Sequence, residues 1–135
     1  MDDSPALKAT STADAEKNVQ LSVPAEASYA RVVRMCASTL AVCCDMSVED
    51  VEDVRMIAEE GFVYACATEP ASVDVTFALA EGAVAMDVTL GDAEPSDESV
   101  DLVEVLLDAV CDEFSVSEDG RTLHLLKRAG EAYGA

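Results

Sequence analysis

Glu60 and Tyr64 are the residues of this chain whose types and spacing most closely suggest chemistry. They stand four positions apart in Glu60-Gly61-Phe62-Val63-Tyr64, and residues four apart on a helix share one face. A carboxylate held on such a face can accept a proton as a general base. The phenol beside it is a poor ligand for Mg²⁺, which prefers compact oxygen ligands in an octahedral array. The pair therefore offers a base without a matching metal ligand.

The helix that must carry this pair is the second of three predicted helices. Ser47 precedes it as an N-cap with Asp50 three residues on, and the acidic first turn suits the helix dipole. Residues 61–67 contain no charge, so we expect this end of the helix to be covered on several sides and to lie at the centre of its layer.

The first predicted helix follows a strand over residues 19–23. Its apolar residues recur at helical spacing and predict a buried stripe of Tyr29, Val32, Val33, Cys36, Leu40 and Cys43. Arg31 and Arg34 fall on the opposite face with Ser38. We expect that face to be exposed, either as plain solvated surface or as a contact for a partner.

The remaining elements are two hairpins and a third helix. Residues 73–79 and 84–90 alternate between apolar and polar around Glu81-Gly82, which predicts a hairpin with one buried face. A helix with Val103, Leu106, Leu107 and Val110 inward follows, and a last hairpin turns at Asp119-Gly120. The order strand, helix, helix, strand, strand, helix, strand, strand predicts an α+β two-layer sandwich. We expect a mixed, mostly antiparallel sheet with the helices on one face.

The chain is expected to form one domain over residues 19–128. Residues 1–18 and 129–135 are small and polar or lack an apolar stripe, which is typical of mobile tails. At 135 residues with half of them apolar, the chain can bury a sizeable core, although only 4% are aromatic.

Charge restricts the functions that the chain can have. Lys and Arg number 8 against 28 Asp and Glu, giving a formal net charge of -20. So acidic a surface repels phosphate backbones and anionic membranes, so we expect neither nucleic acid nor membrane as a partner. No leader or apolar run approaching about 20 residues is present, and we expect a cytoplasmic protein. The five cysteines have no zinc or redox spacing and are expected to be buried free thiols within helices.

The first half of the chain resembles the anti-sigma-factor serine/threonine kinases, which belong to the histidine-kinase-type (GHKL) ATPases with the Bergerat fold. The resemblance rests on Val23-Pro24-Ala25, Tyr29 and Val33-Arg34, and on Glu52-Asp53-Val54-Arg55 with Glu60 closing the run. It implies a Bergerat-like fold for most of residues 19–128, although the matching letters lie in about one third of the chain.

The resemblance also implies where an ATP site would lie, and the chain departs from its motifs. The family's general base corresponds to Glu60, but its Mg²⁺-binding asparagine corresponds to Tyr64. Leu90 stands where an adenine-binding aspartate is expected, with Gly91-Asp92 as the nearest approach to that motif. No glycine-rich phosphate turn precedes the third helix. The sequence therefore predicts a degenerate ATP site and no cofactor, with ATP and Mg²⁺ as the cofactors if the site functions.

Three functions follow from these observations. We expect a regulator that binds a sigma factor or an anti-sigma antagonist through Arg31 and Arg34, and the resemblance leaves a homodimer open. The first alternative is an active ATP-dependent kinase with Glu60 as base, and the second is an acidic DNA mimic. A structural alternative for Glu60 is a hydrogen bond from the Tyr64 hydroxyl. The acidic loop at residues 92–98 lacks the residue spacing of a cation-binding loop. The single histidine, His124, is expected to face solvent or pack beside the sheet.

Overall fold

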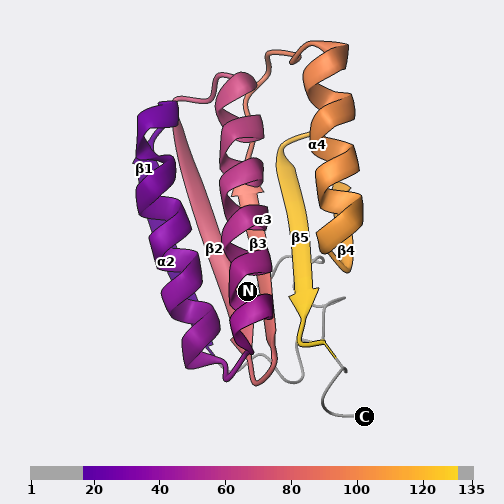
Figure 1. The fold of residues 1–135 in the computed structure, drawn as a ribbon. Coiled ribbons are helices and arrows are strands. Elements are labelled where there is room, and N and C mark those ends of the chain that lie inside the picture. Colours follow the sequence, from indigo (N-terminus) through magenta and orange to yellow (C-terminus); the bar gives the residue numbers. More distant parts are fainter. Residues whose placement is uncertain (1–16, 131–135) are drawn as a thin grey trace.

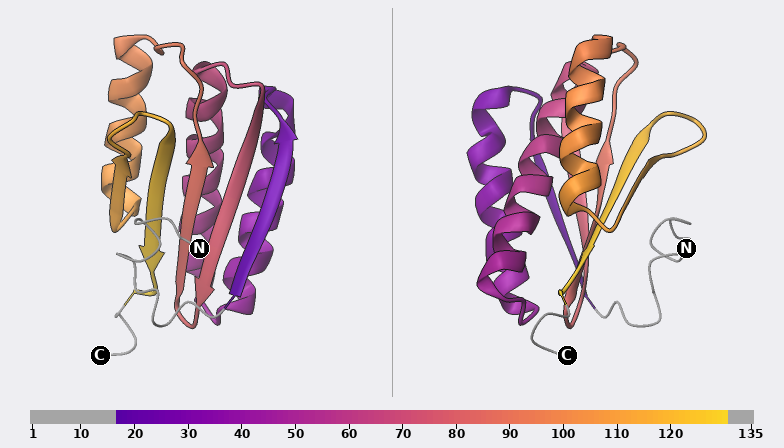
Figure 2. Two further views of the ribbon diagram at one scale, coloured as in Figure 1. Left: turned by 180° about the vertical axis from the view of Figure 1, so that it is seen from behind. Right: turned by 45° about the vertical axis from the view of Figure 1, so that its right-hand side comes forward.

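The computed structural model describes residues 17–130 as a two-layer α+β fold. Its elements are, in chain order, β1 (Lys17–Pro24), the short 3₁₀ helix η1 (Ala27–Tyr29), α2 (Ala30–Cys43), α3 (Val48–Ala67), β2 (Ser72–Ala80), β3 (Ala83–Thr89), α4 (Asp97–Val110), β4 (Glu113–Val116) and β5 (Thr122–Arg128). The three α-helices form one layer against one face of the sheet (Figures 1 and 2).

The sheet has five strands in the order β1-β2-β3-β5-β4. All four neighbouring pairs are antiparallel, so the expectation of a mixed sheet was wrong. The reason lies in the connection through α4, which joins two strands of the same direction, β3 and β4. Because β5 pairs between them, the two parallel strands are never neighbours.

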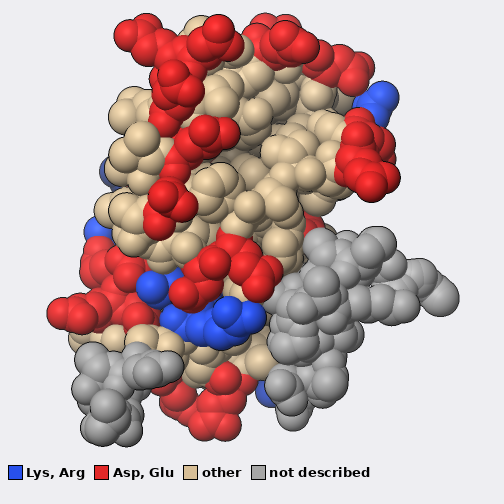
Figure 3. Space-filling view, turned by 90° about the vertical axis from the view of Figure 1, so that its right-hand side faces the viewer, with Lys and Arg blue, Asp and Glu red and all other residues tan. Residues whose placement is uncertain are grey.

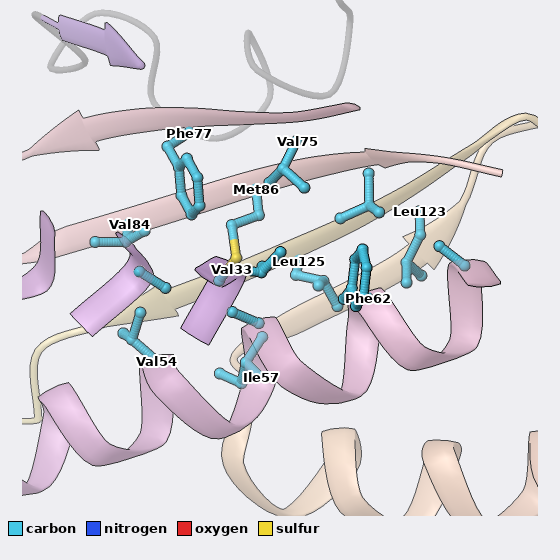
Figure 4. Packing of buried hydrophobic residues seen from close by; sticks show 14 of the residues in the cluster. Val33, Val54, Ile57, Phe62, Val75, Phe77, Val84, Met86, Leu123 and Leu125 are labelled. Carbon is cyan, nitrogen blue, oxygen red and sulfur yellow. The ribbon is translucent and has the colours of Figure 1, made fainter. Parts of the chain in front are cut away.

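The main core lies between the sheet and the helices (Figure 4). Phe62 of α3 is fully buried beside Leu123 and Leu125 of β5, and Phe77 of β2 is buried near Met86 of β3. Burying side chains of this size stabilises the fold by about 1.5–3 kcal/mol each. A second small cluster, Ala78, Ala85 and Leu126, is also buried and lies on the opposite face of the sheet. The expectation of one buried face therefore describes the sheet incompletely.

The buried side of α2 differs from the predicted stripe. Ala30, Val33, Ala37 and Ala41 are its buried residues, whereas Tyr29 and Val32 are 38% and 44% exposed and Cys43 is exposed as well. The buried side is thus made mainly of alanines, whose small side chains let two helices approach closely. Of the predicted stripe, Val33 is buried and Cys36 and Leu40 are partly buried against the core, whereas Met35 and Val42 face outward with Val32.

The second helix, α3, occupies the middle of its layer, as predicted (Figure 1). It contacts α2 on one side, α4 on the other, and strands β2, β3 and β5 below. The side chain of Ser47 accepts a hydrogen bond from the backbone N–H of Asp50 at 3.1 Å, which confirms the N-cap. Gly61, which touches β5, is buried: a Cβ there would lie 2.8 Å from Leu125 Cδ1.

The ends of the domain extend slightly beyond the expected limits. Lys17 and Asn18 belong to β1, paired with Leu79 and Ala78. At the other end, Ala129 N–H donates to Gly82 O at 2.7 Å, and Gly130 N–H donates to Asp50 Oδ2 at 3.0 Å. The rest of the two predicted tails, residues 1–16 and 131–135, lies outside the described residues.

The two hairpin turns form at the predicted glycines. Gly82 and Gly120 have φ values of 74° and 73°, which a residue without a Cβ adopts at little cost. Within residues 17–130, no helix is both long and apolar enough to cross a membrane.

Candidate functional site

Tyr64 fills the space between α3, α4 and the last two strands. Its side chain lines a cavity of about 50 Å³. The remaining walls of this cavity are Val100, Val103, Glu104, Leu107, Phe114, Val116 and Leu123. Ligand pockets for molecules of drug size enclose roughly 300–1,000 Å³, so this cavity is far too small for a nucleotide. The lining is also mostly apolar: its polar side chains are Tyr64 and Glu104, and it contains no Lys or Arg to pair with a phosphate.

Glu60 does not line this cavity, although it lies one helical turn before Tyr64. The carboxylate is half-buried, and this desolvation, with the nearby charge of Glu59, raises its pKa. Among the described residues, no hydrogen bond joins Tyr64 to Glu60, so the proposed contact between them does not form. Glu60 also has no ion-pair partner there. It remains a carboxylate with a raised pKa that does not line the Tyr64 cavity.

The residues of the second motif have structural roles. Leu90 is 7% exposed and belongs to the main core. Gly91 lies directly against the end of α3, where a Cβ would stand 2.3 Å from Thr68 O, and its N–H donates to Thr68 Oγ1 at 2.7 Å. Asp92 points outward and pairs with Arg121 at 3.5 Å. The structure therefore does not bring Leu90, Gly91 or Asp92 together with Tyr64.

The start of α4 is capped by the chain itself. Ser96 Oγ accepts a hydrogen bond from Ser99 N–H at 3.1 Å, and the first turn carries Asp97 and Glu98. Acidic side chains stabilise a helix N-terminus through its dipole. The same charges repel a phosphate from the position where glycine-rich loops bind one.

Arg31 and Arg34, the predicted partner residues, have different surroundings. Arg31 is exposed. The Arg34 side chain is only 24% exposed, and its Nη1 lies 3.2 Å from Glu59 Oε1 on α3. Arg34 therefore links α2 to α3, and Arg31 is the one of the two that is available to a partner.

Three exposed apolar residues lie beside Arg31 on the outer side of α2. Val32, Met35 and Val42 are 44%, 60% and 61% exposed, and their spacing of three and seven residues places them in one row along the helix. We call this row the α2 apolar row. Sequence reasoning missed it because Val32 was assigned to the core.

A buried pair on the sheet face away from the helices was also missed. Asp87 of β3 and His124 of β5 are directly opposite in register, and His124 Nδ1 lies 2.9 Å from Asp87 Oδ1. Both residues are less than 10% exposed, so His124 does not face solvent. Its Nε2 is buried and has no hydrogen-bond partner among residues 17–130. These two residues meet because β5 pairs directly with β3, although β4 precedes β5 in the chain.

The cysteines do not form a reactive or metal site within residues 17–130. All five are free, but only Cys44 is buried, whereas Cys36, Cys66 and Cys111 are partly exposed and Cys43 is exposed. Cys44 and Cys111 also lie just beyond the ends of α2 and α4. The expectation of five buried thiols within helices was therefore wrong. Burial raises the pKa of the Cys36, Cys44, Cys66 and Cys111 thiols and so reduces their thiolate fraction. No three His, Cys, Asp or Glu side chains of the described part of the chain converge as a metal site.

Comparison with known proteins adds no family to these observations. The sequence matches no protein-family model, and a search of curated protein sequences finds no match.

Proposed function

We propose that the protein is a regulator that acts by binding another protein and not by chemistry on a nucleotide. In this proposal it is a Bergerat-like relative of the anti-sigma-factor kinases in a partner-switching system. Its partner is a sigma factor or the antagonist of an anti-sigma factor. Neither the family nor the partner follows from the fold alone, since one fold serves many functions.

The packing around Tyr64 supports the loss of nucleotide binding. The resemblance implies an ATP site along this side of α3, where the cavity measures about 50 Å³. Opening a site of nucleotide size would require α4 to separate from Tyr64, Phe114 and Leu123, with loss of their apolar contacts. The acidic first turn of α4 adds an electrostatic cost to phosphate binding.

The observation that carries the proposal is the α2 apolar row, Val32, Met35 and Val42. Exposed Met and Val side chains in one line on a helix are the form of contact that a partner helix or groove uses. Arg31 beside the row is a cation in a strongly acidic chain, so it can orient a partner by pairing with a carboxylate. Single exposed apolar residues need no explanation, but three on one side of a helix, with only Ser38 and Thr39 between Met35 and Val42 on that side, are what an interaction surface presents.

The test uses purified sigma factors and antagonist domains encoded in the same genome, measured by calorimetry without nucleotide. The Val32→Ser, Met35→Ser double variant should weaken binding about tenfold or more, because both side chains lose their burial against the partner. Val48→Ser is the matched control, since Val48 is 80% exposed at the start of α3. The α2 apolar row would be rejected as the contact if the double variant bound as tightly as wild type. It would also be rejected if the Val48→Ser control lost as much affinity as the double variant.

A kinase activity is the second candidate because Glu60 has the raised pKa that suits a general base. It requires Mg²⁺–ATP to bind. Ligand at about 100 times its dissociation constant would stabilise the protein by roughly 2.7 kcal/mol, which thermal unfolding detects easily. We expect no shift with millimolar Mg²⁺–ATP; a shift of several degrees would favour the kinase.

A further inference from the structure

The solvent side of α4 carries two parallel rows of residues, one apolar and one acidic. Leu102 and Val105 are 62% and 66% exposed, and Ala109 continues their line at helical spacing. The acidic row runs beside them with spacings of four, three and four residues: Asp97, Asp101, Glu104 and Asp108. We call these two rows together the α4 double row.

The exposed apolar residues are not explained by the packing of α4 in the domain. The inner side of this helix uses other residues, Val100, Val103, Leu107 and Val110, and Leu107 alone is buried. A surface helix needs one apolar stripe to pack on its own domain. The second stripe of α4, Leu102 and Val105, makes no contribution to that packing. Burying this stripe against a partner would remove its apolar surface from water and so stabilise the complex.

The acidic row is not neutralised within residues 17–130. The sequence of α4, from Asp97 to Val110, contains no Lys or Arg. None of the four acids takes part in the ion pairs of the described residues, which involve other carboxylates. Four like charges in a line raise the free energy of the isolated helix, so the row is electrostatically complementary to a cationic partner.

The outer surface of α4 is open to solvent around the double row. Glu98, Ser99, Asp101, Leu102 and Val105 lie together on it. Figure 3 faces the side of the molecule that carries α4 and shows a broad uncharged area bordered by acidic side chains. An apolar strip beside an acidic border fits a helix with an apolar face and a basic flank.

We propose that the α4 double row docks a basic amphipathic helix of a partner protein. The apolar face of that helix covers Leu102 and Val105, and its Lys or Arg residues lie along Asp97, Asp101, Glu104 and Asp108. The charged pairs set orientation and speed association, and the apolar contact determines how slowly the complex dissociates. This surface lies on a different helix from the α2 apolar row, so it does not depend on the function proposed above.

The test uses the full chain and a synthetic peptide of about 18 residues, a length at which an isolated helix becomes marginally stable. The probe carries leucines on one face and lysines on the adjacent flank. A second peptide replaces the leucines by serine and keeps every lysine. Amide shifts in an NMR titration show where each peptide binds. We expect the leucine–lysine peptide to shift α4 residues and to bind about tenfold more tightly than the serine–lysine peptide.

Variants of the protein separate a specific contact from attraction to the net charge. Leu102→Ser with Val105→Ser leaves the charge unchanged and should weaken the leucine–lysine peptide about tenfold. Val48→Ser, an exposed valine at the start of α3 outside both proposed surfaces, should leave binding unchanged. Asp101→Asn with Asp108→Asn should weaken binding at about 50 mM salt and much less at about 500 mM.

Two results would overturn the proposal. One is equal affinity of the two peptides, which would mean that general charge attraction accounts for all binding. The other is equal binding to wild type and to the Leu102→Ser, Val105→Ser variant. Thermal unfolding of each variant shows that it is folded, as expected for residues so exposed.

Discussion

Truncation of Tyr64 tests whether packing, and not hydrogen bonding, closes the space between α3 and α4. Its ring lines the small cavity with Val103, Leu107, Phe114 and Leu123. The hydroxyl makes no hydrogen bond among the described residues. Two substitutions therefore separate the two contributions: Tyr64→Phe removes the hydroxyl and keeps the ring, and Tyr64→Ala removes both.

The expected magnitudes follow from burial. Replacing a fully buried Phe or Trp by Ala costs roughly 3–5 kcal/mol. Tyr64 is half-buried and already borders a void of about 50 Å³, so we expect Tyr64→Ala to lower the free energy of unfolding by about 2–3 kcal/mol. For a domain of this size that is a fall in melting temperature of about 8–12 °C. Tyr64→Phe should change it by less than about 0.5 kcal/mol, because no hydrogen bond is lost.

Urea unfolding followed by circular dichroism measures both values, with thermal unfolding as the second probe. The two variants should also unfold with unchanged dependence on urea, since the surface exposed on unfolding stays nearly the same. A loss below about 1 kcal/mol in Tyr64→Ala would show that the ring does not hold α4 in place. Equal losses in the two variants would show that the hydroxyl has a partner, and the packing argument would be wrong.

Three further predictions concern single features. Glu60→Gln should raise the melting temperature at pH 7 more than the exposed-loop control Glu94→Gln. Since the folded state raises the pKa of Glu60, ionisation costs stability as pH rises, and differential scanning fluorimetry should show the gain vanishing toward pH 4. Asp87→Ala should lower the free energy of unfolding by about 1–3 kcal/mol, because buried His124 loses its hydrogen bond to Asp87. The double variant Asp87→Ala, His124→Leu should recover part of that loss, as measured by urea unfolding. Gly91→Ala should cost about 1–3 kcal/mol by the same assay, because its Cβ would meet Thr68 O at 2.3 Å.

Local signals in the sequence were sufficient wherever short-range geometry decides the structure. The Ser47 cap forms as predicted because Asp50 N–H lies within reach of its hydroxyl in the same turn. The turns at Gly82 and Gly120 form because few other residues adopt a positive φ at low cost. The uncharged end of α3 lies in the middle of the helix layer, because a helix surface without charged residues is stable where neighbouring elements cover it.

The same reasoning failed where partners are distant in the chain. The buried side of α2 consists mainly of alanines such as Ala37 and Ala41, because α3 approaches closely there, and no local pattern reveals that approach. Hydrophobicity instead favoured Val32 and Tyr29. Asp87 and His124 are 37 residues apart, and their pairing depends on β5 lying beside β3. That strand order cannot be read from alternation within either strand.

The sequence singled out the residues of the candidate site but did not reveal their roles in the fold. Tyr64 was expected at the position of the family's Mg²⁺-binding asparagine, and its side chain lines the small cavity beside α4. The roles of Leu90 and Gly91 were not foreseen, because both depend on where the end of α3 meets the end of β3. Leu90 completes the core, and Gly91 permits the close contact with Thr68. These positions are explained by folding alone, without any reference to a ligand.

The packing around Tyr64 also determines how α4 presents its outer surface. Leu107 is the single fully covered residue of this helix, so much of the attachment of α4 comes from partly buried contacts around the Tyr64 ring and Phe114. A cavity large enough for ATP would remove those contacts and leave α4 held by little else. The contacts around Tyr64 and Phe114 hold α4 against the domain with Leu102 and Val105 facing outward. A rigid surface binds a partner at lower entropic cost than a mobile one. In the function that we propose, the same packing around Tyr64 therefore favours protein binding and opposes nucleotide binding.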